Sequence, residues 1–308
     1  MAERSQHNPS SAGHWRLIAL GGAISLAAAM FSVSGRASAQ ANTQASHFIQ
    51  VATAANTIAE FTKIDNGATN NQPNDLLFVT PDYNPGELCG CIADRVPVGV
   101  DYDTSTDAWY IFNEDGSSMT AGTAFNVLVV PSASTTAFVW TATTSNSEGD
   151  STFINSSATN GLPKAVLQVT QRFNGIEEDD PVGVWYEKDA SEWAIFNEDA
   201  ADIDTTGQDS FDVLVGATQS GGGKDLVQKA TSANSLESWT VVNSAITNGD
   251  PNAFAIETPD WNPGGKGGTY TPWATGVFDE TIGQLAVLIQ NGETMAPKMA
   301  FNMLLYNS

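Results

Sequence analysis

Two short motifs place carboxylates side by side at corresponding points of the chain, Asn113-Glu114-Asp115 and 197–199 (Asn-Glu-Asp). Paired carboxylates are the acid and the nucleophile of glycoside hydrolases, so a glycosidase is one candidate. Each pair, however, ends a run with the alternation of a β-strand, where adjacent side chains point to opposite faces. A turn in which the acidic side chains bond the local backbone is therefore favoured, and no catalytic residue is predicted.

Histidine is too scarce for most hydrolytic sites. The chain has three, and two of them, His7 and His14, precede an apolar stretch at 17–33. A basic start before this stretch and the sequence Ala-Ser-Ala at 37–39 after it are typical of a signal peptide. We expect residues 1–39 to be removed, a single membrane anchor being the alternative. The mature chain is then secreted, periplasmic or extracellular, with no membrane span.

The charge balance excludes several partners. Twelve Lys and Arg against 35 Asp and Glu give a formal net charge of −23, while 41% of the residues are hydrophobic. Phosphate backbones repel such a chain, so nucleic-acid binding is not expected. The hydrophobic fraction is high enough for a folded core.

Calcium is the one cofactor that the sequence suggests. Asp101, Asp103, Ser105 and Asp107 offer oxygen ligands at alternate positions, as at the start of a calcium loop. The sixth position is Thr106 rather than Gly, and no Glu stands at the twelfth. The alternative is a hairpin turn in which Asp, Ser and Thr bond their own backbone.

The chain has two cysteines, Cys89 and Cys91, separated by one glycine. Disulfides persist in oxidising, extracytoplasmic surroundings, so a local or an intermolecular disulfide is predicted. Two thiols without a nearby histidine are poor ligands for tetrahedral zinc.

Aromatic residues give a second route to function. Tyr83, Phe173 and Trp261 each precede an asparagine in a turn, and in the outer copies these are Asn84 and Asn262. Such rings could stack on a sugar, with the amides bonding its hydroxyls. The alternative is that the rings cover one end of the core, since Tyr and Trp are often partly buried.

An internal repeat organises the chain. Ile-Phe-Asn-Glu-Asp at 111–115 recurs letter for letter at 195–199, each time preceded by Pro-Val-Gly-Val and followed by Phe-x-Val-Leu-Val. A diverged third copy has Leu285 in place of the tryptophan and Asn291-Gly292 in place of the Glu-Asp pair. Three units are predicted, at 47–130, 138–217 and 226–307.

Each unit has the pattern of β structure. Trp109 and Ile111 alternate with Tyr110 and Phe112, and Phe125-Asn-Val-Leu-Val alternates in the same way. We expect an all-β chain of three tandem, small β-sandwich-like domains with about six short strands each. Trp109, Trp193, Ile111 and Ile195 are predicted core residues. A merged β solenoid is the second choice, although its repeats usually run to roughly 20 to 45 residues.

The motifs Pro-x-Gly-Val-Trp-Tyr, Trp-x-Ile-Phe-Asn-Glu-Asp and Phe-x-Val-Leu-Val resemble those of an uncharacterised family of secreted bacterial repeat domains. The resemblance covers nearly all of 47–307 and implies no enzyme activity. The tandem copies favour a binding or surface-associated module, for an extracellular polysaccharide or a surface protein, because several weak sites can act together. A structural matrix or assembly protein is the alternative, and a glycoside hydrolase is less favoured.

Overall fold

The computed structural model describes residues 44–87, 91–175, 177–206, 209–216, 223–280 and 283–307. Strands dominate these residues, and the helix found among them is a single turn, Pro85–Glu87. No helix of the described residues has the length and apolar character needed to cross a membrane. The predicted signal peptide lies outside them.

Seven strands form each repeat, one more than expected, because a two-residue strand makes a hairpin with the strand that follows it. Repeat 1 contains β1 (Ser46–Val51), β2 (Thr57–Ile58), β3 (Phe61–Lys63), β4 (Leu76–Asp82), β5 (Val98–Asp103), β6 (Ala108–Asn113) and β7 (Ala124–Val130). Repeat 2 contains β8 (Ala137–Thr141), β9 (Ser147–Glu148), β10 (Ser151–Ile154), β11 (Leu167–Arg172), β12 (Val182–Glu187), β13 (Glu192–Asn197) and β14 (Ser210–Val215). Repeat 3 contains β15 (Lys224–Lys229), β16 (Ser235–Leu236), β17 (Trp239–Val241), β18 (Phe254–Pro259), β19 (Thr275–Glu280), β20 (Gln284–Ile289) and β21 (Ala300–Tyr306).

Every repeat is a small β-sandwich, as predicted. In repeat 1, a three-stranded part in the order β1-β7-β4 faces a four-stranded part in the order β2-β3-β6-β5. Trp109 and Ile111 from β6 and Phe125 and Val127 from β7 form the core between them, with no solvent exposure. The same orders recur in repeats 2 and 3, around the predicted core residues Trp193 and Ile195 in repeat 2.

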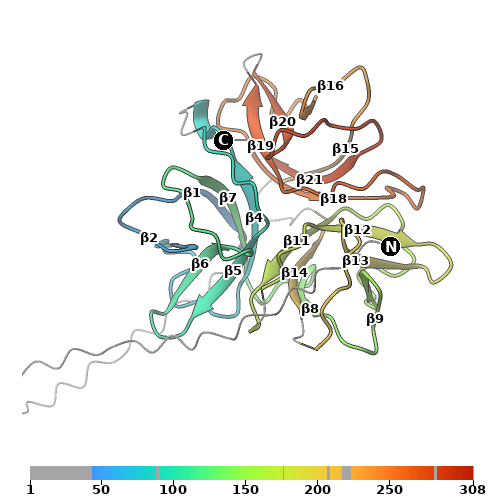
Figure 1. Ribbon diagram of the computed structural model, residues 1–308, viewed down its shortest axis with the longest axis horizontal. Coiled ribbons are helices and arrows are strands. Elements are labelled where there is room, and N and C mark those ends of the chain that lie inside the picture. Colours follow the sequence, from blue (N-terminus) through green and yellow to red (C-terminus); the bar gives the residue numbers. More distant parts are fainter. Residues whose placement is uncertain are drawn as a thin grey trace, which may run out of the picture. The chain divides into compact units, whose positions relative to one another are not determined.

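The three sandwiches are merged in a cycle. The three-stranded part of repeat 1 continues through β4 into β19 of repeat 3, and that of repeat 2 continues through β11 into β5 of repeat 1 (Figure 1). Between repeats 2 and 3, the connection is a parallel bridge that joins Val184 in β12 to Asp260. The chain is therefore an all-β repeat protein whose three units share their sheets.

Two strands of each three-stranded part, such as β4 and β7 in repeat 1, are buried on both faces. β7 and β21 are buried at all seven positions, including those that alternation would leave to solvent. Their second faces meet in a fourth core, to which all three repeats contribute. It includes Phe78, Leu128, Leu214, Ile256 and Leu304. Strands covered on both sides carry near-continuous apolar runs, which explains the runs Leu-Leu-Phe-Val and Val-Leu-Val-Val.

Candidate functional site

We call the contact region between two neighbouring repeats a joint. Two of the three joints contain a repeated glycine and a buried glutamate. Glu114 Oε2 accepts a hydrogen bond from the Glu178 backbone N–H of repeat 2 (3.1 Å), and Glu198 Oε2 accepts one from the Thr271 N–H of repeat 3 (2.8 Å). A Cβ at Gly99 would stand 1.9 Å from Glu114 Oε1. The glycine of each Pro-Val-Gly-Val motif therefore makes room for the glutamate of its own repeat.

These glutamates are not paired with their neighbouring aspartates. Burial is the main cause that raises the pKa of Glu114 to about 9 and that of Glu198 to about 8. Asp115 instead accepts a hydrogen bond from the Ser117 N–H in the next turn (2.8 Å). The two carboxyls of each motif thus face different surroundings, one at a repeat joint and one in a turn, as the strand alternation indicated.

The joint between repeats 3 and 1 differs from the other two. The sequence comparison set Asn291-Gly292 against the Glu-Asp pairs, but in the structure Gln290 takes the place of Glu114 and Glu198, since a Cβ at Gly276 would stand 2.2 Å from Gln290 Nε2. Neither polar atom of its buried side chain has a hydrogen-bond partner. Asp94, which lies between the cleft residues Ala93 and Arg95 in the sequence, also has a buried oxygen, Oδ2, without a hydrogen-bond partner. The hydrogen bond that closes the other two joints is therefore missing here.

A cleft of about 300 Å³ opens at this joint. Tyr83 reaches it from the end of β4 of repeat 1, while Trp239 from β17 and Phe278 from β19 form walls from repeat 3. The Trp239 and Phe278 rings pack edge to face, with centroids 5.7 Å apart. Arg95 and Asn291, both exposed, supply polar groups to the same cleft. It combines apolar rings with hydrogen-bonding groups, as small-molecule sites do.

One small residue leaves this space open. In the joint between repeats 2 and 3, Tyr270 packs against Trp261 and Phe196, with ring centroids 5.9 Å away in both cases. At the joint between repeats 3 and 1, Tyr83 and Leu288 correspond to Trp261 and Phe196, and both line the cleft. Tyr270 lies four residues before Ala274, the residue that directly precedes β19. The corresponding residue of repeat 1 is Ala93, which lies four residues before Pro97, directly ahead of β5. No ring therefore fills the gap.

The three aromatic residues singled out in the sequence do occupy equivalent places. The backbone N–H groups of Tyr83, Phe173 and Trp261 each donate to a valine carbonyl of the adjacent repeat at 2.9 Å. Their rings differ in surroundings: Phe173 packs on Phe112 and Trp261 on Trp185, whereas Tyr83 lines the cleft. They lie at the joints rather than at the end of a core.

The two asparagines that follow these rings are bound by the protein's own backbone. Asn84 donates to the Asp279 carbonyl and accepts from its N–H, both at 2.8 Å. Asn262 makes the same pair of bonds with Tyr186, at 2.9 and 2.6 Å. Both amides are used to hold repeats together, so the geometry does not favour their predicted role in ligand binding.

The predicted calcium loop forms the hairpin turn between β5 and β6. The carboxylate of Asp103 accepts hydrogen bonds from the Ser105 N–H (2.7 Å), the Ser105 hydroxyl (2.9 Å) and the Thr106 hydroxyl (2.9 Å). These bonds lower the pKa of Asp103, although partial burial raises it. Asp101 lies within β5 and Asp107 at the end of the turn, in a left-handed conformation. The geometry fits the turn interpretation, and calcium binding here stays a prediction.

Of the two cysteines, Cys91 is disulfide-bonded, and Cys89 lies outside the described residues. The local pairing of the two therefore stays a prediction.

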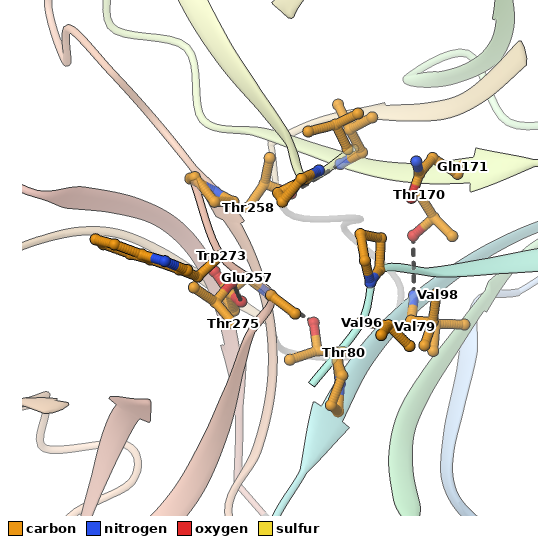
Figure 2. A pocket seen from close by; sticks show the side chains of 17 residues that line it. Val79, Thr80, Val96, Val98, Thr170, Gln171, Glu257, Thr258, Trp273 and Thr275 are labelled. Carbon is orange, nitrogen blue, oxygen red and sulfur yellow. Dashed lines mark hydrogen bonds between the residues drawn. The ribbon is translucent and has the colours of Figure 1, made fainter. Parts of the chain in front are cut away.

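A second cavity lies where the three repeats meet. It measures about 70 Å³, and Figure 2 shows Thr80, Thr170 and Thr258 around it, one from each repeat. Each threonine hydroxyl accepts a hydrogen bond from a backbone N–H of another repeat, such as that of Val79 to Thr170 at 3.0 Å. Glu257 enters this cavity and accepts from the Thr275 hydroxyl, and its burial raises its pKa to about 7. The space suits ordered water rather than a larger ligand.

The comparisons with known proteins define the class. The model of a family described as Domain of unknown function (DUF7452) matches residues 8–129, 99–215 and 183–305. The chain belongs to this family and carries three copies. No curated protein and no solved structure matched.

Three cleft residues were not singled out from the sequence: Arg95, Trp239 and Phe278. Trp239 and Phe278 have counterparts of other types in the repeats, Phe61 and Asp101 in repeat 1. The signal that could have indicated them is this divergence, because the third copy has aromatic residues on both strands that flank β20, whereas the first copy has one at the corresponding positions.

Proposed function

We propose that this protein is an exported carbohydrate-binding repeat protein and that sugar units bind in the cleft between repeats 3 and 1. The observation that carries the proposal is a cleft of about 300 Å³ lined by Tyr83, Trp239 and Phe278. Aromatic faces suit the C–H groups of a sugar ring. The exposed side chains of Arg95 and Asn291 can bond to hydroxyls at its rim.

The charge of the chain favours neutral sugars over acidic ones. At a formal net charge of −23, a polyanionic glycan is repelled over distances comparable to the Debye length, about 8 Å at physiological ionic strength. A single arginine at the rim does not offset this. The expected ligands are therefore neutral hexose-type units.

Export is supported by two observations. The leader has the basic start, apolar stretch at 17–33 and small-residue triplet of a signal peptide. Cys91 is disulfide-bonded, which is typical of proteins in oxidising compartments.

The test is a binding screen of the purified chain against neutral and acidic oligosaccharides and insoluble polysaccharides. We expect saturable binding to a neutral glycan that weakens at least tenfold, about 1.4 kcal/mol, in Tyr83→Ala and in Trp239→Ala. Phe173→Ala is the matched control, because Phe173 occupies the position of Tyr83 at another joint. Folding of each variant is checked by its thermal unfolding.

Two results would contradict the proposal. One is a folded protein that binds none of the glycans. The other is equal loss of binding in Phe173→Ala and Tyr83→Ala, which would place the binding outside the cleft. Binding to acidic glycans alone would overturn the preference for neutral sugars.

A structural or assembly role is the second candidate, and exposed edge strands favour it. β1 and β8 each end a sheet, and they expose Ile49 (41%), Val51 (40%) and Val139 (46%). Unpaired edges with apolar side chains can pair with another copy. Light scattering across a concentration series tests this role, and a monomer at all concentrations would exclude it.

A further inference from the structure

The wall of the cleft between repeats 3 and 1 contains a buried amide without hydrogen bonds. Gln290 directly follows β20 and is one of the residues that line the cleft. It is 4% exposed, and neither Oε1 nor Nε2 of its side chain has a hydrogen-bond partner. Buried amides are bonded in most native structures, because an unpartnered one costs free energy. A ligand that enters the cleft can supply the bonds that the fold does not.

At the other two joints, the residue at this position is bonded. Glu114 and Glu198 accept hydrogen bonds from the backbone N–H groups that lie four residues before β12 and β19. The residue four before β5 is Asp94, and Gln290 accepts no bond from it. The segment that bonds to the glutamates thus does not bond to Gln290, and this is the joint at which the cleft lies.

The backbone around Gln290 is fixed, whereas no hydrogen bond holds its side chain. Its N–H donates to the Ala274 carbonyl (3.0 Å), and the Ile289 N–H donates to the Ser238 carbonyl (2.9 Å). The amide lies against Gly276, where a Cβ would stand 2.2 Å from Nε2. Turning the amide from this place into the cleft breaks no hydrogen bond of the protein. Such changes of side-chain rotamer are common on binding.

The chemistry of the Gln290 amide indicates the group that it binds. A carboxamide has an acceptor oxygen beside a donor nitrogen, and two hydroxyls on adjacent carbons of a sugar match both atoms. A carboxylate ligand matches only the nitrogen. The acetamido group of an amino sugar has its N–H and its carbonyl on opposite sides, because such an amide is trans, so it matches one atom at a time. A pair of adjacent hydroxyls therefore satisfies Gln290 fully.

We propose that Gln290 determines the specificity of the cleft by bonding to two adjacent hydroxyl groups of a neutral sugar unit. This inference rests on the proposed function and names the part of the sugar that is recognised. The rings of Tyr83, Trp239 and Phe278 suit the C–H face, which many hexoses share, and so discriminate little among them. Hydroxyls at the rim of the sugar ring differ between hexoses, and a sugar without the pair leaves the amide unpartnered.

The test compares the unchanged protein with Gln290→Met, which keeps the length of the side chain and removes both polar atoms. The probes are the methyl glycosides of glucose, galactose and mannose and analogues that each lack one hydroxyl, with affinities measured by NMR titration. The unchanged protein should bind at least one parent glycoside and bind two of its analogues, whose missing hydroxyls are adjacent, at least tenfold more weakly. Gln290→Met should bind the parent at least tenfold more weakly and should bind those two analogues as well as it binds the parent.

Thermal unfolding of the ligand-free protein separates recognition from a structural role. Gln290→Met removes an unpartnered amide, so Tm should stay the same or rise. Glu114→Met is the matched control at the equivalent position of another joint. It removes a carboxyl that accepts a backbone N–H, so it should lower Tm by about 3 °C and leave glycoside binding unchanged.

Two binding results would overturn this inference and leave the proposed function intact. One is binding that weakens in Tyr83→Ala but is unchanged in Gln290→Met, and the other is discrimination against the two analogues that persists in Gln290→Met. A Gln290→Met protein that loses as much Tm as Glu114→Met, or does not fold, would show that the fold needs the amide and would overturn the inference as well. An unchanged protein that binds no glycoside or glycan would contradict the proposed function and this inference together.

Discussion

The joint between repeats 2 and 3 and the joint between repeats 3 and 1 have the same plan but different contents. In the first, Glu198 bonds to the Thr271 N–H and Tyr270 packs between Trp261 and Phe196. In the second, the side chain of Gln290 has no hydrogen-bond partner and the small Ala93 leaves a cleft open.

The difference shows how a repeat protein can gain a site. Two joints with a bonded glutamate, together with the shared sheets and the central core, hold the cycle together. The joint between repeats 3 and 1 can then do without a bonded glutamate and without a ring at Ala93, because β4 still pairs with β19. A binding site can then form where the repeats differ in sequence, while the positions that they share stabilise the fold.

The largest expected effect is a loss of stability when a joint with a bonded glutamate is disturbed. Gly99→Ala would place a Cβ 1.9 Å from Glu114 Oε1 and force the buried glutamate out of its position. We expect a loss of about 3 kcal/mol in the free energy of unfolding, at the upper end for overpacking a core. Denaturant unfolding measures it, with Gly67→Ala as the control, because a Cβ at Gly67 meets nothing within 4 Å.

Gly99→Ala combined with Glu114→Ala should recover part of this stability, since the clashing carboxyl is then gone. An equal loss in Gly99→Ala and Gly67→Ala would contradict the role assigned to the glycine. A loss in Gly99→Ala that the second substitution does not relieve would show that the glutamate is not the group it accommodates.

The next effect concerns pH. The pKa values of Glu114 and Glu198, about 9 and about 8 in the folded protein, lie above the ordinary value of 4.5. The stability they contribute is full below pH 4.5 and is lost as the pH rises toward 9, because the unfolded chain then ionises more readily. Tm should fall from pH 5 to pH 9.

Glu114→Gln makes the joint between repeats 1 and 2 resemble the joint between repeats 3 and 1, which has Gln290 at this position. The substitution keeps an acceptor for the Glu178 N–H. It should reduce the slope of Tm against pH while changing Tm at pH 5 little. A slope as steep as that of the unchanged protein would show that Glu114 is ionised in the fold.

Much of the architecture could be predicted from local patterns. Exact recurrence of Ile-Phe-Asn-Glu-Asp defined the repeat, and alternation around Trp109 and Trp193 predicted sandwiches with these residues inside, where the structure places them. The matching positions of Tyr83, Phe173 and Trp261 followed from the same alignment and are equivalent in the fold. These features depend on neighbours in the sequence or on the copies themselves.

The cyclic arrangement could not be predicted in this way. Pairing of β4 with β19 joins Asp82 to Val277, and no local pattern records such distant partners. One signal was present: the apolar run 76–79 at the start of β4 is typical of strands buried on both faces, and the structure buries all seven residues of β4. The cleft was missed because it depends on an absent ring at Ala93, which becomes visible only beside Tyr270.

The smallest expected effect on stability distinguishes the two joints most directly. Ala93→Tyr places in the cleft the ring that Tyr270 provides at the other joint, between Tyr83 and Leu288. Because the space already exists, we expect the free energy of unfolding to change by less than about 1 kcal/mol. Glycan binding should nevertheless be lost, which a titration of the folded variant measures.

The reciprocal substitution, Tyr270→Ala, is the control. It removes a side chain that is 44% exposed, so it should cost about 1 kcal/mol or less and leave glycan binding unchanged. Binding that persists in Ala93→Tyr would place the ligand elsewhere, whereas binding lost in both variants would show that the two joints are coupled. Loss in Ala93→Tyr alone would support the open joint as the site, because the two substitutions exchange one ring between otherwise corresponding positions.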